Sequence, residues 1–236
     1  ACCPTNIVRF LPSIPGFIYS KNKNGVSINL YIQSEVKVDI GGKQVTINQK
    51  NSQPWDDKCL IEVDNISGRD ISLFLRVPQW SNKIIVKLNN KKQTPKVTKG
   101  YISLTIPMNK KSNLEVDLGM EINIVQANPN VRQNFGKQAL QRGPIVYCME
   151  EIDNGADLHK ISVIKKSLKP KRGLLNNYNY TFISGEGNMT KDVGWNKKLY
   201  SIDHLNTFKN KKIKLIPYFL WANRNVGEMK VWFTNN

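Results

Sequence analysis

The 236-residue chain carries 35 lysines and arginines against 18 aspartates and glutamates, a net charge of +17 at pH 7. A chain of this length can bury about 70% of the surface that its unfolded form exposes, so it does not need disulfides for stability. Its four cysteines are few and irregularly spaced, which excludes a small disulfide-bonded scaffold. No apolar run approaches the roughly 20 residues of a membrane-spanning helix, so we expect no membrane partner.

The cations are mostly lysines that lie in scattered, turn-like stretches such as KNKNG, NNKK and KNKK, and only KKSLKPKR resembles a patch. Binding to nucleic acid depends on clustered cations that release counterions from phosphates. The scattered pattern favours a solvated, lysine-rich surface and predicts no nucleic-acid partner. A basic protein that binds acidic polymers remains a third hypothesis for the function.

The first residues differ from the rest of the chain. The chain begins ACCPTN, with no initiator methionine and no recognisable signal peptide, so we expect it to be part of a longer polypeptide. In the segment that follows, Ile7, Phe10, Leu11 and Ile14 have helical spacing, which predicts one short helix near residues 5–15 that prolines then bend or end. Because one amphipathic helix cannot bury its own face, it packs on the following domain or its natural partners are missing.

Alternation with period two begins after this helix. It runs through SINLYIQ, EVKVDI, KQVTINQ, CLIEVDN, DISLFLRV, KIIVKLN, YISLTI and NLEVDLGMEINIV. Such alternation predicts strands with one buried face. Turn signals such as GGK and LNNKK separate the strands at intervals of about ten residues, which is typical of an antiparallel β-sandwich. We therefore predict a β-sandwich domain over residues 20–128.

The period-two alternation is interrupted around Asn128–Pro129, where we place a domain boundary. It resumes with the apolar strand PIVYCME. Residues 153–195 read as loop-rich. Two further strands, KIKLIPYFLWANR and GEMKVWFTN, are joined by a turn at residues 225–227. These signals predict a second β-sandwich domain over residues 129–236. The expected fold class is mainly β, with two jelly-roll-like sandwiches after one short helix.

Cys2 and Cys3 are the first candidates for chemistry. The positive end of a helix dipole favours the thiolate form of a cysteine in the first turn. Two adjacent thiolates could hold a soft cation, but a zinc site needs three or four protein ligands, and no Cys-x-x-Cys or histidine pair completes the set. From the residues alone, half of a metal site and two inert, packed thiols remain equal alternatives.

The other reactive or ring-bearing residues have structural interpretations. Cys59 and Cys148 lie in apolar strands and read as buried packing residues. The lone histidines His159 and His204 read as surface or hydrogen-bonded residues. The adjacent acidic pairs Asp56–Asp57 and Glu150–Glu151 have no expected catalytic role, because neighbours on a strand point to opposite faces and those in a turn are usually solvated. An exposed tryptophan could stack on a sugar, but core or inter-domain packing is favoured for Trp55, Trp80, Trp195, Trp221 and Trp232. Arg76 and Arg142 read as structural.

Five stretches resemble, in order and spacing, bacterial β-L-arabinofuranosidases of glycoside hydrolase family 127: CCPTNIVRFLPSIPGFIYS, SQPWDDKCLIEV, LRVPQWSNKIIVKLN, GKQALQRGPIVYCMEE and IPYFLWANRNVGEMKVW. The resemblance covers nearly the whole chain, which corresponds to the C-terminal third or so of such enzymes. It implies an N-terminal (α/α)6 barrel that carries the active site and is followed by β-sandwiches. Residues 1–19 would then be the last helix of a truncated barrel.

The resemblance also implies roles for the cysteine pair. Cys2 would be the nucleophile of a retaining hydrolase that releases L-arabinofuranose from plant-type glycans. Cys2 and Cys3 would be zinc ligands, and the remaining ligands and the glutamate acid/base would precede Ala1. The expected partners are an L-arabinofuranosyl-containing glycan and the missing barrel of the same chain, in a bacterial cytoplasm or periplasm. The isolated chain would be inactive, and a non-catalytic carbohydrate-binding or packing module is the alternative.

Overall fold

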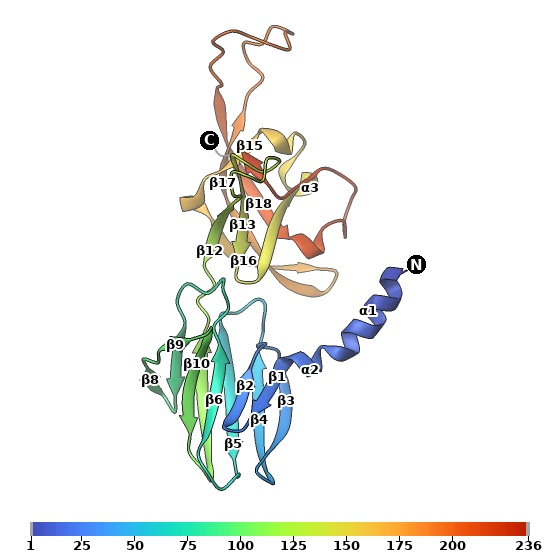
Figure 1. Ribbon diagram of the computed structural model, residues 1–236. Helices are drawn as coiled ribbons and strands as arrows, with labels where there is room; N and C mark the ends of the chain where they lie inside the picture. The colour runs from blue at the N-terminus through green and yellow to red at the C-terminus, as the bar shows by residue number, and fades with distance from the viewer. Residues whose placement is uncertain (1, 235–236) are drawn as a thin grey trace. The chain divides into compact units, whose positions relative to one another are not determined.

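The structure is a computed structural model that describes residues 2–234, and of Cys2 only the backbone. The chain forms two compact units that divide between Glu121 and Ile122 (Figure 1). Sequence reasoning placed the division later, after residue 128. Residues 122–126 belong to the second unit because they form an antiparallel pair with the strand that begins at Lys137.

The first unit contains two sheets that pack as a sandwich. Its strands pair antiparallel except for β2 and β6, which are parallel. The first sheet has the order β1 (Tyr19–Asn22), β2 (Gly25–Ile28), β6 (Ile71–Arg76), β10 (Tyr101–Ile106), β9 (Val97–Thr98). The second has the order β3 (Ser34–Ile40), β4 (Lys43–Asn51), β5 (Lys58–Asn65), β11 (Lys110–Asp117), β7 (Ile85–Leu88), β8 (Lys91–Gln93).

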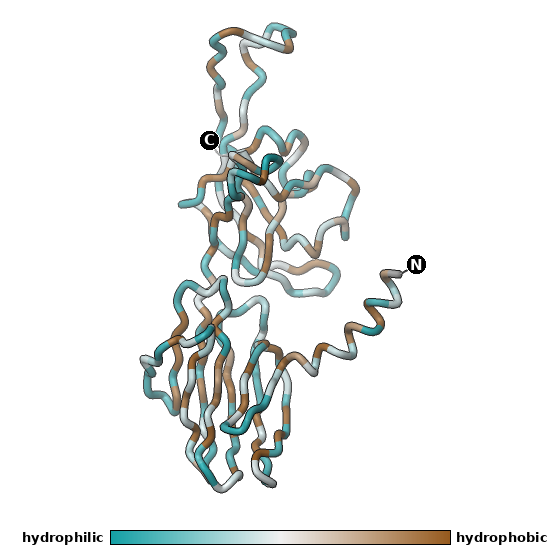
Figure 2. The backbone as a smooth tube through the Cα atoms, viewed as in Figure 1, coloured by the Kyte–Doolittle hydropathy of each residue, from teal (hydrophilic) through white to brown (hydrophobic). Residues whose placement is uncertain are grey.

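The core of the first unit follows directly from the period-two pattern. Alternate residues of each strand point inward, so that Leu73 and Ile102 of one sheet share a buried cluster with Val45 and Ile61 of the other. Figure 2 shows the same alternation of apolar and polar residues along the strands. Asn89 and Asn90 adopt positive φ angles between β7 and β8, as a two-residue hairpin turn requires. The predicted sandwich is therefore confirmed in this unit.

Two helices precede the first strand. Helix α1 (Cys2–Ser13) contains Pro12 and ends one residue later, and α2 (Pro15–Ile18) begins with a proline. Proline is tolerated in the first turn of a helix but disrupts its interior. The predicted short helix near residues 5–15 is confirmed. Within residues 2–234, no helix has both the length and the apolar character needed to cross a bilayer.

The second unit is also mainly β, but its strands form one sheet that closes on itself. The ring is β13 (Lys137–Arg142), β14 (Ile145–Glu150), β18 (Phe208–Pro217), β17 (Tyr178–Thr190), β15 (Ile161–Val163) and β20 (Phe233–Thr234), which pairs back to β13. Three strands lie outside the ring: β12 (Ile122–Gln126), β16 (Lys169–Leu175) and β19 (Met229–Lys230). Short helices connect them: α3 (Glu151–Asn154), η1 (Leu158–Lys160), η2 (Lys165–Ser167) and η3 (Tyr218–Leu220). Tyr147, Leu215 and Phe233 fill the interior.

Two details of the second unit differ from the sequence-based expectation. Residues 153–195 were predicted to be loop-rich, but they include β17, a strand of 13 residues. Its glycines misled the prediction: a Cβ at Gly187 would lie 2.3 Å from the Ser162 carbonyl oxygen, so glycine here permits a close strand approach rather than a loop. The last predicted strand, GEMKVWFTN, is divided into the two-residue strands β19 and β20.

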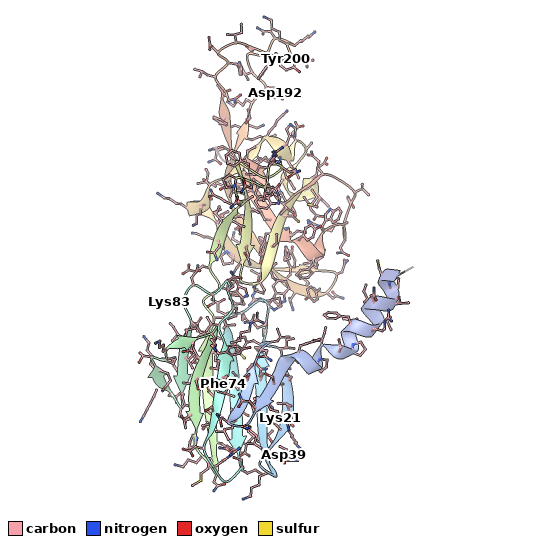
Figure 3. All side chains as sticks on the ribbon, in the orientation of Figure 1. Lys21, Asp39, Phe74, Lys83, Asp192 and Tyr200 are labelled. Carbon is pink, nitrogen blue, oxygen red and sulfur yellow. The ribbon has the colours of Figure 1, made fainter. Side chains whose placement is uncertain are left out.

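An extended arm connects β17 to β18. Figure 3 labels Asp192 and Tyr200 on it. At its base the Lys191 N–H donates to the Thr207 carbonyl at 2.8 Å, and Lys160 binds Asp192 at 2.7 Å. The rings of Trp195 and His204 pack 4.3 Å apart within the arm. Beyond them, the apolar side chains of Leu199, Tyr200, Ile202 and Leu205 are almost fully exposed.

Candidate functional site

Helix α1 carries the cysteine pair on a segment that lies in solvent. Ile7, Phe10 and Leu11 share one face through their spacing, yet each is more than half exposed, and residues 3–13 include no buried side chain. An isolated helix of 12 residues is marginally stable in water, so most helices of this length depend on packing of their apolar face. The described part of the chain leaves this face uncovered.

Cys3 lies exposed in the first turn of α1, while the side chain of Cys2 lies outside the described residues. Nowhere in the described chain do three His, Cys, Asp or Glu side chains come together as metal ligands would. A structural or catalytic zinc site requires three or four protein ligands. The described residues therefore do not supply the zinc site that the family resemblance implies, and any such site would need ligands from elsewhere.

The two other cysteines are packing residues, as predicted. Cys59 and Cys148 are fully buried in β5 and β14. Burial raises the pKa of the Cys59 thiol to about 11 and that of Cys148 to about 12. Both therefore remain protonated near neutral pH and are poor nucleophiles and metal ligands.

Of the two histidines, His159 has the surface position predicted for it, whereas the Nε2 of His204 is buried and forms no hydrogen bond within the described residues. His159 is exposed on η1, and the half-buried His204 packs against Trp195 in the arm. Asp56 and Asp57 lie in the turn before β5, where the Asp57 carbonyl accepts a hydrogen bond from the Leu118 N–H at 2.9 Å. His159 does lie near the Asp157 carboxylate, but the hydrogen bond from Lys160 has the larger effect on the pKa of Asp157 and lowers it.

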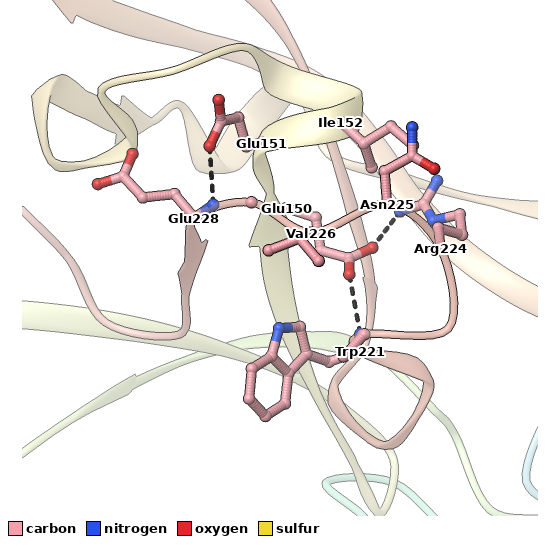
Figure 4. A pocket seen from close by; sticks show the side chains of 10 residues that line it. Glu150, Glu151, Ile152, Trp221, Arg224, Asn225, Val226 and Glu228 are labelled. Atoms are coloured by element: carbon pink, nitrogen blue, oxygen red, sulfur yellow. Dashed lines mark hydrogen bonds and ion pairs between the residues drawn. The ribbon is translucent and has the colours of Figure 1, made fainter.

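The pair Glu150–Glu151 has a structural role that sequence reasoning missed (Figure 4). Glu150, at the end of β14, is only 4% exposed and accepts hydrogen bonds from the Arg224 guanidinium and from the Ala222 N–H. Glu151 faces the other way and accepts from the Glu228 N–H at 2.8 Å. The two carboxylates thus hold both ends of the segment 222–228, which closes over a cavity of about 120 Å³.

Arg224 is the centre of this arrangement. Its guanidinium donates from Nη1 and Nη2 to the two oxygens of Asp153, at 3.0 and 2.6 Å, in the bidentate geometry that arginine favours. Lys214 Nζ donates to the same carboxylate at 3.0 Å. Burial alone would raise the pKa of Asp153, but the hydrogen bonds from Arg224 and Lys214 hold it below its ordinary value. The hydrogen bonds that Arg224 donates to Asp153 in turn raise the pKa of Arg224.

This cluster could not be found from the sequence. Glu150 and Asp153 lie about 70 residues from Arg224, at separations of 74 and 71, and nothing in the local pattern links them. The one available signal was a charged residue at the end of the apolar strand IVYCME, since a glutamate that continues an apolar strand is rarely buried without a partner. Arg224 and Lys214 together balance the charges of Glu150 and Asp153, so the cluster is a structural anchor and not a catalytic pair.

Of the tryptophans, Trp80 packs against the core of the first unit, as predicted for it. Trp221 departs from that prediction, because it is 43% exposed and lies parallel to the exposed ring of Tyr218 at 6.2 Å. Arg76 donates to the Asn29 carbonyl, and Arg142 is buried beside Tyr147. Both arginines have the structural positions that the sequence predicted.

Comparison with known proteins identifies both units. Residues 25–120 match the family described as Beta-L-arabinofuranosidase, GH127 middle domain. Residues 122–234 match the Glycoside hydrolase family 127 C-terminal domain. The boundary between the two matches coincides with the division between the two compact units.

Individual relatives agree with this assignment. The chain is 26% identical to a non-reducing end β-L-arabinofuranosidase of Bifidobacterium longum subsp. longum, over 98% of this chain and 36% of that protein. A crystal structure of a GH127 β-L-arabinofuranosidase from Geobacillus stearothermophilus T6 matches with a TM-score of 0.93 and 32% identity, over 99% of this chain and 37% of that one. The structure of a GH127 β-arabinofuranosidase matches with a TM-score of 0.86 and 28% identity, over 100% of this chain and 39% of that one.

The chain thus spans a little more than a third of the length of these relatives. The two domain matches account for nearly all of its described residues, and the structural similarity extends over both units. The resemblance first seen in the five sequence stretches is confirmed. The chain belongs to glycoside hydrolase family 127, of which it carries the middle and C-terminal domains.

Proposed function

We propose that this chain is the C-terminal portion of a retaining, zinc-dependent β-L-arabinofuranosidase, and that its substrate is a glycan with terminal L-arabinofuranosyl residues. The observation that carries the proposal is the position of the cysteine pair. Cys2 and Cys3 lie in the first turn of an exposed amphipathic helix, directly before two domains of family 127. Relatives that match over 98–99% of the chain are named as β-L-arabinofuranosidases.

The uncovered apolar face of α1 supports a partner domain. Because Ile7, Phe10 and Leu11 are just over half exposed, full burial would stabilise each by about 1–1.5 kcal/mol, roughly half the value for a fully exposed side chain. A catalytic barrel in the same enzyme, packed on this face, would stabilise the helix and fix the cysteines at its first turn. Within the described chain, every side chain of residues 3–13 is exposed, so the helix that carries Cys3 gains no burial from the rest of it.

The proposed chemistry is a double displacement at the anomeric carbon. The Cys2 thiolate attacks that carbon and forms a C–S bond while the glycosidic C–O bond breaks, and an acid outside this chain protonates the leaving oxygen. Water then attacks the same carbon, the C–S bond breaks, and the thiolate is regenerated as the proton passes to the base. Two inversions leave the configuration of the sugar retained.

The proposal includes a zinc ion, for which this chain would supply only part of the ligands. Cys2 and Cys3 would provide two thiolate ligands, and the others would come from outside the described residues, because these contain no third ligand near Cys3. When bound, the metal favours the deprotonated form of its thiolate ligands. We expect the 236-residue chain alone to bind zinc weakly, since two ligands leave the tetrahedral shell open.

Hydrolysis of a β-L-arabinofuranosyl aryl glycoside tests the proposal. The 236-residue chain should show no turnover, whereas the same residues joined to a family 127 barrel should be active. In the active protein, Cys2→Ser should abolish turnover, and Cys3→Ser should lower zinc content measured by atomic emission. Cys59→Ser is a poor control because it alters the core, but an alanine at the exposed Ser13 should leave both properties unchanged. Turnover by the chain alone, or full activity of Cys2→Ser, would refute the assignment.

A further inference from the structure

A second surface of the C-terminal unit has the composition of a ligand site. It is an open groove of about 590 Å³ between β13, β14, η3 and the segment 229–232. Small-molecule sites typically have volumes of about 300–1,000 Å³, with mostly apolar walls and a few convergent polar groups. This groove lies within one unit and shares no residue with the cysteine pair.

Aromatic and apolar side chains form one part of the groove. Tyr218 is 45% exposed, Trp232 is half-buried, and Val146 adds an aliphatic side chain that is partly exposed. Trp221 lies parallel to Tyr218, with an angle of 13° between the rings, and supports it from the side of the neighbouring cavity. Flat, amphipathic rings of this kind offer apolar area at a small cost in conformational entropy.

Two lysines and an amide form the polar part. Lys137 is held in place because its Nζ donates to the Gln133 carbonyl at 2.6 Å, which leaves two further N–H groups. The ammonium group of Lys230 forms no hydrogen bond or ion pair within the described residues, and Asn134 contributes an amide. Burial and the charge of Lys137 both lower the pKa of Lys230, against an opposing effect of Glu228. An anion between the two ammonium groups would relieve this repulsion.

The lining favours a carboxylate over a phosphate. The groove as described contains neither arginine nor glycine, which are the residues that most often form bidentate or backbone cradles for phosphate groups. The residues that line it include no carboxylate, and the nearby Glu228, which acts on Lys230, accepts a hydrogen bond from the Leu158 N–H outside the groove. A ligand that combines a flat apolar face with hydroxyls and one carboxylate would satisfy the rings, the amide and the lysines together.

We propose that this groove binds a glycan through a uronic acid unit, whose ring lies against Tyr218 and Trp232 and whose carboxylate is bound by Lys137 and Lys230. A polysaccharide is the polymer that a protein of this family meets, and a net charge of +17 would attract an acidic one. The site would hold the protein on an acidic glycan independently of any catalytic centre. The inference therefore does not rest on the roles of Cys2 and Cys3.

Titration calorimetry with an oligomer of galacturonic acid tests this site on the 236-residue chain. The neutral galactose oligomer of equal length should bind at least about tenfold more weakly, which corresponds to about 1.4 kcal/mol. The double variant Lys137→Gln/Lys230→Gln should weaken binding of the acidic oligomer by a similar factor. Its matched control is Lys209→Gln/Lys212→Gln, which removes the same charge from exposed positions of β18 and should change affinity less than about twofold.

The aromatic part is tested separately by Trp232→Leu and Tyr218→Leu, each of which should weaken both oligomers, while thermal unfolding checks that the variant is folded. Equal binding of the acidic and neutral oligomers would overturn the proposal, as would equal losses in the groove and control lysine pairs. Polyphosphate that binds more tightly than the uronate oligomer, with the same dependence on Lys137 and Lys230, would show that the groove selects phosphate instead. Absence of binding by the acidic oligomer would also overturn it.

Discussion

The two units bury polar groups of different kinds. In the first unit the buried polar side chains are all uncharged: Gln49, Asn65, Ser67 and Ser112. In the second they include two ionisable groups: Gln138, Arg142, Glu150, Asn154, Ser162 and Thr181. A buried neutral amide needs only hydrogen bonds, whereas a buried charge needs an opposite charge as well. The second unit therefore depends on the buried Glu150 carboxylate paired with Arg224, whereas the ion pairs of Glu115 in the first unit join side chains that are each at least 30% exposed.

The contrast is visible in how each unit fixes an irregular segment. Asn65, at the end of β5, donates to the carbonyls of Arg69, Ile106 and Pro107 and so joins two turns with one amide. In the second unit the segment 222–228 is held by Glu150 and Asp153 through Arg224. We therefore expect the stability of the first unit to fall most when a core side chain is shortened. The stability of the second unit should depend more on the charges around segment 222–228 and on pH.

The largest effect should come from a cavity in the first unit. Leu73 is fully buried between the two sheets, and Leu73→Ala should destabilise this unit by about 3 kcal/mol, the sum of lost burial and the cavity left behind. Urea unfolding followed by amide hydrogen exchange would assign the loss to a unit. Leu60→Ala is the matched control, because Leu60 points outward from β5 and is 51% exposed. A loss below about 1 kcal/mol at Leu73 would contradict the packing described here.

A smaller loss of stability should follow from removing the positive charge of Arg224 in the second unit. Arg224→Met keeps much of the side-chain volume but leaves Glu150 and Asp153 buried without it, which we expect to cost about 2–3 kcal/mol. Hydrogen exchange should show the loss in the second unit and in the segment 222–228 first. Arg132→Met, at an exposed arginine of the same unit, should leave stability within about 0.5 kcal/mol. If both variants were equally stable, the ion pairs of Arg224 would contribute nothing to the free energy of unfolding.

The contrast between the units also explains which parts of the fold could be predicted from the sequence. The first unit consists of strands with one inward face, so its alternation predicted nearly every central strand and its sandwich form. In the second unit the same method failed where the backbone itself sets the structure, as at Gly187, and where the partners are distant in sequence, as for Glu150 and Arg224. Periodicity reports which face of a strand is buried, but not what a buried charge meets.

The candidate sites divide in the same way. The cysteine pair was found because a short motif and a helix start coincide at Cys2 and Cys3. The groove was missed because its members lie far apart in the sequence and come together only in the closed sheet: Lys137 in β13, Tyr218 in η3, Lys230 in β19 and Trp232 just before β20. Trp232 had been read as a packing residue, which is correct for its buried half and omits the half that faces the groove.

The smallest effect, and the one that separates the units most sharply, is their response to acid. Hydrogen bonds from Arg224 and Lys214 lower the pKa of Asp153 in the folded chain despite its burial, whereas the unfolded chain has the ordinary value of about 3.9. The unfolded state therefore binds more protons below about pH 5, so this stabilisation is present above the unfolded pKa and is lost as the pH falls through the folded one. In the first unit, Glu115 also has a lowered pKa through Lys87, but both side chains are partly exposed and salt should screen the effect. Unfolding free energies measured for each unit by hydrogen exchange between pH 7 and pH 3, in high salt, should fall more steeply for the second unit, and Arg224→Met should remove most of that difference. Parallel pH profiles in the two units, or an unchanged slope in Arg224→Met, would show that the charge cluster does not set the acid stability of the C-terminal unit.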